Sequence, residues 1–184
     1  KKKKNSKLIS LKRNILLASQ SVSLDDSITF VLKKYKKLKG YIPEYILLSK
    51  LNCPFRNYKH LDNAINTIQL FDLDVVYGVS IENKIFFKHN GKTLKPLRTL
   101  DRSMIRYPGN KKVNIRVESE EIYSESGNFI LYNSKKFLLS KNKQKIKIGH
   151  EILDKLSSFE VNNKFDWLIA DNIAKKFKKF SELI

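Results

Sequence analysis

Three of the chain's six arginines lie close together in the segment PLRTLDRSMIRYPG. Arg98, Arg102 and Arg106 follow one another at intervals of four residues, which places them on one face of a helix. A guanidinium group can bind phosphate through two parallel hydrogen bonds, whereas a lysine acts as a point charge. The spacing predicts a row of phosphate contacts. The alternative is internal pairing with Asp101 and with the glutamates of residues 118–125.

A second set of polar side chains falls on the outer face of a helix expected over Tyr58–Phe71. Asparagine can bind adenine with two hydrogen bonds, and lysine or arginine can reach guanine or phosphate. We expect nucleic-acid contacts from Arg56, Lys59, His60, Asn63, Asn66 and Thr67. A solvent-exposed face or a protein-binding face would have the same composition.

Asp74 and the run Glu82-Asn83-Lys84 flank an apolar stretch. This arrangement resembles the core of PD-(D/E)xK nucleases, in which two carboxylates hold Mg²⁺ and the lysine helps to activate water. The resemblance requires Glu82 and Lys84 to continue a strand, but the turn residues favour a hairpin there. A metal-dependent nuclease is therefore the lesser alternative.

One dense acidic patch could bind a divalent cation or act as a general base. It consists of Glu118, Glu120, Glu121 and Glu125. No Asp or His stands at a defining distance from it, so an exposed strand with balancing charge explains it more simply. The three histidines are scattered, and neither a glycine-rich phosphate loop nor a GxSxG motif is present. We predict no enzymatic activity, no catalytic residue, no metal and no cofactor.

Charge is the dominant property of the composition. The 184 residues carry a formal net charge of +19, and 41% of them are hydrophobic, enough for a sizeable core. Such a field attracts polyanions. We expect a nucleic-acid partner, DNA rather than RNA, and no membrane. A homodimer or an assembly with other proteins is compatible with this charge, and a lysine-rich genome could account for part of it.

The first 22 residues are expected to form a basic arm or leader, because no acidic residue precedes Asp25. Cys53 is the single cysteine, which excludes an internal disulfide, and no apolar run approaches the ~18 residues of a membrane span. An intracellular location follows, in the cytoplasm, nucleoid or nucleus, with an organelle as the alternative.

Residues 23–93 predict three helices and a hairpin. The first helix begins near Ser23 or Asp25 and ends at Gly40, and a second begins at Pro43 with Leu47, Leu48 and Leu51 inward. The third is Tyr58–Phe71, and VVYGVSI and KIFFKHN would pair as a hairpin. This order of elements resembles a winged helix-turn-helix domain. The resemblance implies that the third helix enters the major groove and that the hairpin touches the backbone or the minor groove. Lys84 and Lys88 of the hairpin are candidate phosphate contacts because of their charge.

Residues 94–184 predict a second, basic α+β domain. A short helix over Pro96–Tyr107 would be followed by strands at KVNIRV, IYSE, NFILY, KKFLLS and KIKI, which suggest a small antiparallel sheet. Helices near His150–Phe159 and Lys164–Leu183 would close the chain. Arg116, Lys175, Lys176 and Lys179 add candidate phosphate contacts.

The sequence thus predicts an α+β fold with an N-terminal winged-helix domain, a small antiparallel sheet and C-terminal helices. The expected function is DNA binding by a transcription regulator or replication initiator. An RNA-binding ribonucleoprotein component is the alternative, since charge at both ends suits a protein embedded in RNA.

Overall fold

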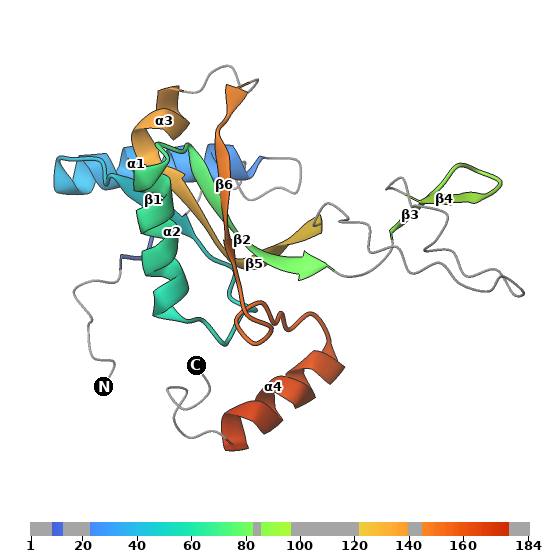
Figure 1. Ribbon diagram of the computed structural model, residues 1–184. Helices are drawn as coiled ribbons and strands as arrows, with labels where there is room; N and C mark the ends of the chain where they lie inside the picture. The colour runs from blue at the N-terminus through green and yellow to red at the C-terminus, as the bar shows by residue number, and fades with distance from the viewer. Residues whose placement is uncertain (1–8, 13–22, 83–85, 97–121, 140–144, 177–184) are drawn as a thin grey trace, which may run out of the picture.

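The computed structural model describes residues 9–12, 23–82, 86–96, 122–139 and 145–176. These residues form four helices and six strands (Figure 1). The helices are α1 (Leu24–Lys39), α2 (Tyr58–Leu70), α3 (Ser134–Leu139) and α4 (Lys164–Lys176). The strands are β1 (Tyr45–Leu48), β2 (Val75–Glu82), β3 (Phe87–His89), β4 (Leu94–Pro96), β5 (Ile122–Asn133) and β6 (Ile148–Ile152). The fold is therefore mixed α+β, as predicted.

Four strands form one mixed sheet in the order β1-β5-β2-β6. β5 is antiparallel to both β1 and β2, whereas β2 and β6 are parallel. Consequently β1, β2 and β6 all run in one direction and only β5 runs against them. Strands on both sides of the boundary expected after residue 93 share this sheet.

The ends of α1 follow from its capping residues. The side chain of Ser23 accepts a hydrogen bond from the Asp26 backbone N–H at 3.3 Å and donates one to the Asp26 carboxylate at 2.8 Å. Gly40 ends the helix in the left-handed conformation, with φ of 83°, and its N–H reaches the Lys36 carbonyl. The predicted bounds of this helix are confirmed.

The main core lies between α2 and one face of the sheet. Ala64 and Ile68 of α2 are buried because they pack against apolar side chains of all three adjoining strands. Those side chains are Val76 of β2, Phe129 and Leu131 of β5, and Leu153 just after β6. Figure 1 shows α2 lying along this sheet. The predicted helix over Tyr58–Phe71 is confirmed to within one residue, but Phe71 is exposed.

α1 lies on the opposite face of the sheet. Successive side chains of a strand point to opposite faces, so Tyr77 and Tyr132 point away from the core residues that precede them. Burial, then the neighbouring Tyr77, and then the Asp25 charge at the start of α1 raise the pKa of Tyr132 to about 12. The sheet is thus covered by a helix on each face.

The middle of β5 bulges out of register with β2. Tyr77 pairs with Ile130, whereas Val79, only two residues on, pairs with Glu125. Four residues of β5, 126–129, lie opposite the single Gly78 of β2, and all four are buried. Bulges of this kind re-aim backbone and side chains and are common next to active sites.

The predicted helix after Pro43 is wrong, since Tyr45–Leu48 forms strand β1. Pairing with β5 supplies long-range backbone partners that local helix signals cannot reveal. The expectation that the leucines of this segment point inward is also wrong, because Leu51 is 98% exposed.

The predicted hairpin is wrong as well: β2 pairs with β5 and β6, and β3 pairs with β4. A winged-helix arrangement is not confirmed.

The C-terminal expectations are corrected in several places. IYSE and NFILY belong to the single strand β5, and KKFLLS lies largely in helix α3 rather than a strand. The helix expected near His150–Phe159 is strand β6 followed by a turn, and the sheet is mixed rather than purely antiparallel. α4 confirms the final helix over Lys164–Lys176. The helix expected over Pro96–Tyr107 and the strand KVNIRV lie almost wholly outside the described residues.

In the described ranges, none of the helices has the length and apolar character that a membrane crossing requires.

Candidate functional site

The segments that follow β1 and β6 meet at the bulge of β5. Because β1 and β6 run in the same direction, both end at the same edge of the sheet. Open α/β sheets bind ligands in the crevice outside the carboxyl ends of such strands. We call this region the carboxyl edge. It comprises residues 49–57, 126–129 and 153–162.

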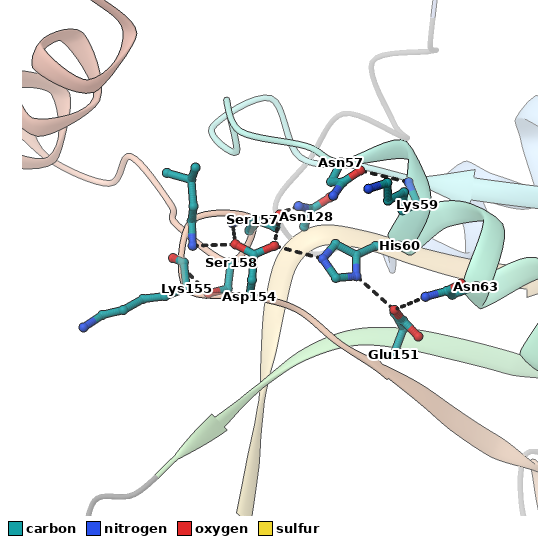
Figure 2. A network of polar contacts seen from close by, with 11 residues as sticks. Asn57, Lys59, His60, Asn63, Asn128, Glu151, Asp154, Lys155, Ser157 and Ser158 are labelled. Atoms are coloured by element: carbon teal, nitrogen blue, oxygen red, sulfur yellow. Dashed lines mark hydrogen bonds and ion pairs between the residues drawn. The ribbon is translucent and has the colours of Figure 1, made fainter. Parts of the chain in front are cut away.

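His60, in the first turns of α2, is bonded at both ring nitrogens (Figure 2). Nδ1 lies 2.9 Å from Glu151 Oε1, and Nε2 lies 2.9 Å from Asp154 Oδ2. Burial alone would lower the pKa of His60, but the hydrogen bonds and charges of the two carboxylates outweigh it and raise the pKa. Asn63 donates to the same Glu151 oxygen at 3.0 Å.

Asp154 is the hub of the turn that follows β6. Its Oδ1 accepts the backbone N–H groups of Leu156 and Ser157, each at 2.8 Å. Its Oδ2 accepts the Ser157 hydroxyl at 2.6 Å as well as the His60 ring. Burial opposes ionisation, but the bonds from Ser157, His60 and Leu156 lower the pKa of Asp154 to about 2. This carboxylate is therefore fully ionised at neutral pH.

Asn128, at the bulge of β5, connects that turn to the segment after β1. Its buried side-chain amide donates to the Ser157 carbonyl at 2.5 Å. The backbone carbonyl of Asn128 accepts hydrogen bonds from the Ser49 hydroxyl at 2.6 Å and from Arg56 Nε at 3.4 Å. One continuous set of hydrogen bonds thus runs from α2 and β6 to the residues that follow β1.

Gly127 brings a cation and a carboxylate to the same point of the bulge. Its backbone N–H donates to Glu160 Oε1 at 2.5 Å. A Cβ added at Gly127 would lie 3.0 Å from that oxygen and 3.0 Å from Lys50 Nζ, with Lys50 Cδ closer still at 2.6 Å. Only glycine leaves room for both side chains over the backbone here.

Arg56 and Lys50 supply positive charge to the carboxyl edge. The Arg56 guanidinium donates to the Lys50 carbonyl through Nη2 and to the Asn128 carbonyl through Nε. Both of these acceptors are neutral. Within the described part of the chain, no carboxylate lies within ion-pair distance of either cation. Their charges are available to a bound anion.

Cys53 lies close enough to these cations to feel their charge, and it is completely buried. Burial raises the pKa of its thiol, and the Glu160 charge raises it further, while Arg56 and Lys50 partly oppose this. The thiol is therefore neutral at physiological pH. It packs like a small apolar side chain and is not a nucleophile in this state.

The segment carrying Glu160 is attached to the segment after β1. Asn52 donates its amide to Asn162 Oδ1 at 2.9 Å, and its carbonyl accepts the Val161 N–H at 2.8 Å. The rings of Phe55 and Phe159 lie 6.0 Å apart. These contacts hold the Glu160 carboxylate over the bulge. The arrangement provides two cations, a backbone donor and one acid, a combination suited to binding and orienting an anionic group.

The expected recognition face of α2 is partly used inside the protein. Three of its six residues bond to other parts of the protein. Arg56 donates to two backbone carbonyls. His60 contacts the carboxylates of Glu151 and Asp154, and Asn63 donates to Glu151. Lys59 and Asn66 are exposed and Thr67 is partly exposed. His60 and Asn63 thus bond to β6 and the turn after it, while Arg56, Lys59, Asn63 and Asn66 remain exposed to solvent.

The remaining predicted contacts are scattered or not described. Lys88 is exposed on β3, and Lys175 and Lys176 are exposed at the end of α4, where Lys175 lies 2.5 Å from Asp171. The other predicted residues lie outside the described part of the chain: Lys84, Arg98, Arg102, Arg106, Arg116 and Lys179.

The nuclease pattern does not assemble. Asp74 immediately precedes β2 and Glu82 ends it, so that the two carboxylates stand roughly 25 Å apart along the strand. Asp74 instead accepts the Lys147 N–H at 2.7 Å, and Glu82 accepts the Ser124 hydroxyl at 2.9 Å. In the ranges that the structure describes, no group of three or more His, Cys, Asp or Glu could hold a metal ion.

Most residues of the carboxyl edge were not predicted from the sequence. The sequence predicts two strands, IYSE and NFILY, on either side of Ser126-Gly127, although a glycine within a strand pattern is also the signal of a bulge. Lys50 and Glu160 both bond to Gly127, which is 77 and 33 residues away, and Asp154 contacts His60, which is 94 residues away, so no local pattern predicts these contacts.

Comparisons with known proteins give little direct identification. No family model and no curated protein matches the chain. Among the solved structures that match is the crystal structure of a 4-diphosphocytidyl-2C-methyl-D-erythritol synthase from Anaerococcus prevotii. It is 14% identical to this chain, with a TM-score of 0.49, and the match covers 84% of this chain and 68% of that one.

These findings correct the predicted function. The helix and hairpin that defined the winged helix are absent from the described residues, and half of the proposed recognition side chains bond within the protein. The prediction of a non-enzymatic nucleic-acid-binding protein, with its ribonucleoprotein and nuclease alternatives, is therefore wrong.

Proposed function

We propose that the chain is a domain of a small-molecule enzyme whose carboxyl edge binds an anionic substrate. The substrate would carry a phosphate or a carboxylate group. Lys50 and Arg56 would provide the compensating charge, and the Gly127 N–H a directional donor.

The observation that carries this proposal is the position of Glu160. The carboxylate of this residue accepts the Gly127 N–H, and Lys50 Nζ approaches the same side of Gly127 without forming an ion pair with Glu160. A substrate anion of similar chemistry would find the same donors. Arg56 adds a planar set of N–H donors within the same segment.

The placement of the edge also supports this function. It lies where β1 and β6 end, next to a buried bulge and the N-terminal end of α2, whose first turn contains no acidic residue. Backbone N–H groups at a helix N-terminus favour negative charge.

Binding can be measured by calorimetry with a panel of small anions on the full chain. The panel contains pyrophosphate and the four ribonucleoside triphosphates as phosphate ligands, and gluconate as a carboxylate ligand. Each titration is run at low and at moderate salt, because the net charge of +19 attracts any anion weakly.

Two substitutions at the edge should act in opposite directions. Lys50→Met removes a charge-assisted contact and should weaken binding of the best anion about tenfold. Glu160→Gln removes a competing negative charge and should strengthen that binding about threefold or more. Lys37→Met, on the exposed face of α1, is the matched control and should leave the affinity nearly unchanged.

Equal weakening by Lys50→Met and Lys37→Met would show that anions bind only to the diffuse charge of the surface, which contradicts the proposal. If Lys50→Met loses affinity only for the phosphate ligands, or only for gluconate, the affected ligand identifies the anionic group that the carboxyl edge prefers.

A further inference from the structure

The two contacts of His60 determine its protonation state by geometry. Both ring nitrogens lie 2.9 Å from carboxylate oxygens, one of Glu151 and one of Asp154. An ionised carboxylate oxygen can only accept a hydrogen bond, so each nitrogen must carry a proton. The ring, 16% exposed, is therefore held as an imidazolium between two acids (Figure 2).

This imidazolium is connected to the carboxyl edge by a short series of hydrogen bonds. Asp154 binds His60 and Ser157 with the same oxygen. The Ser157 carbonyl receives the Asn128 amide, and the Asn128 carbonyl receives Arg56 Nε. Three bonds thus separate the charged ring from the bulge residue that fixes Arg56.

We propose that His60 is a positioning residue for the anion site: its imidazolium fixes the turn after β6, and through this turn Asn128 and Arg56. This role rests on the proposed function of the carboxyl edge. His60 itself would not touch the anion.

Loss of the proton should release this arrangement. A neutral imidazole can donate from only one nitrogen, so the other would present a lone pair to a carboxylate. The charged or titratable groups that face the ring are Glu151 of β6 and Asp154 of the turn, while Asn63 on its own helix is neutral. No compensating cation replaces the lost charge among these groups.

The direction of the pH dependence follows from the raised pKa of His60. A group with a raised pKa stabilises the folded arrangement fully below its ordinary value of 6.5 and loses that effect as the pH rises through the folded-state pKa. Anion affinity should therefore fall as the pH increases above 6.5.

The test combines two measurements on the full chain. Nuclear magnetic resonance follows the three histidine rings through a pH titration, in the wild type and in Glu151→Gln. Calorimetry follows the binding of pyrophosphate over the same pH range. Glu151→Gln keeps an acceptor for Nδ1 but removes one negative charge, so it should shift the His60 midpoint to lower pH.

Pyrophosphate itself changes protonation over this pH range. Because this change is the same in titrations of the wild type and of Glu151→Gln, it cancels when the two proteins are compared. In the wild type, the His60 ring should titrate with a midpoint above pH 6.5, and the affinity for pyrophosphate should fall over the same pH range. In Glu151→Gln, the midpoint of the ring titration and the midpoint of the affinity loss should both move to lower pH. His60→Gln, which does not titrate, should bind more weakly at low pH and lack the part of the pH dependence that His60 causes.

Three outcomes would overturn the role. A His60 midpoint below 6.5 refutes the fixed imidazolium. Pyrophosphate binding with the same pH profile in wild type and Glu151→Gln refutes the positioning role alone. Failure of pyrophosphate to bind to any variant at any pH refutes an anion site for this ligand, and thus the proposed function in its phosphate form together with the role of His60.

Discussion

At the scale of single residues, the carboxyl edge depends on polar groups whose partners come from distant elements. Asp154 alone accepts four hydrogen bonds, from a helix side chain and from its own turn. Each bond from such a donor to an ionised carboxylate is stronger than a bond between neutral groups. The turn is therefore defined by one side chain.

Asp154→Ala should lower the free energy of unfolding at neutral pH by about 1–3 kcal/mol, a range reduced for the partial exposure of the side chain. The pKa of Asp154 is lowered to about 2, so its contribution is present above the ordinary value of 3.8 and is lost as the pH falls through 2. Urea unfolding across acidic pH should show the stabilities of the two proteins converging near pH 2. Asp62→Ala, at an exposed position of α2, is the control and should show neither effect.

Sequence reasoning identified three residues of this network, Arg56, His60 and Asn63, but gave them another role. All three were expected to contact nucleic acid, because a polar helix face has the same composition whether it meets solvent, a ligand or another strand. The distinction depends on β6, which lies about ninety residues further along the chain. No local pattern contains that information.

At the scale of elements, local signals predicted the helices better than the strands. Ser23 and Gly40 bound α1, and α2 follows its apolar spacing. β1 was mistaken for a helix because Pro43 and the following leucines suit both, and only pairing with β5 decides between them. The parallel pairing of β2 with β6 likewise joins residues about seventy positions apart.

Gly149 tests how closely α2, β2 and β6 are packed. A Cβ at this position would lie 2.3 Å from Leu73 Cδ1, so Gly149→Ala should lower the free energy of unfolding by about 1–3 kcal/mol. Leu73→Ala removes the obstructing atom, and the double variant should lose less stability than the sum of the two single variants. Chemical denaturation of all four proteins measures this. Simple additivity would mean that the two residues do not meet.

At the scale of the whole molecule, the net charge of +19 predicted a polyanionic partner but could not indicate where an anion binds. The lysines of α1 are spread over an exposed helix, whereas Lys50 and Arg56 are placed together by the ends of β1 and the bulge of β5. The fold class was predictable from composition and periodicity. The carboxyl edge was not, because it exists only once the mixed sheet has formed.

The most direct test of the central claim is to map the binding site of a small anion by nuclear magnetic resonance. Backbone amide shifts are recorded on the full chain while the best-binding anion of the panel is added at moderate salt. The account predicts the largest changes at the amides of Lys50, Gly127, Asn128 and Glu160. Changes confined to the lysines of α1 and α4, with those four amides unmoved at saturation, would contradict it.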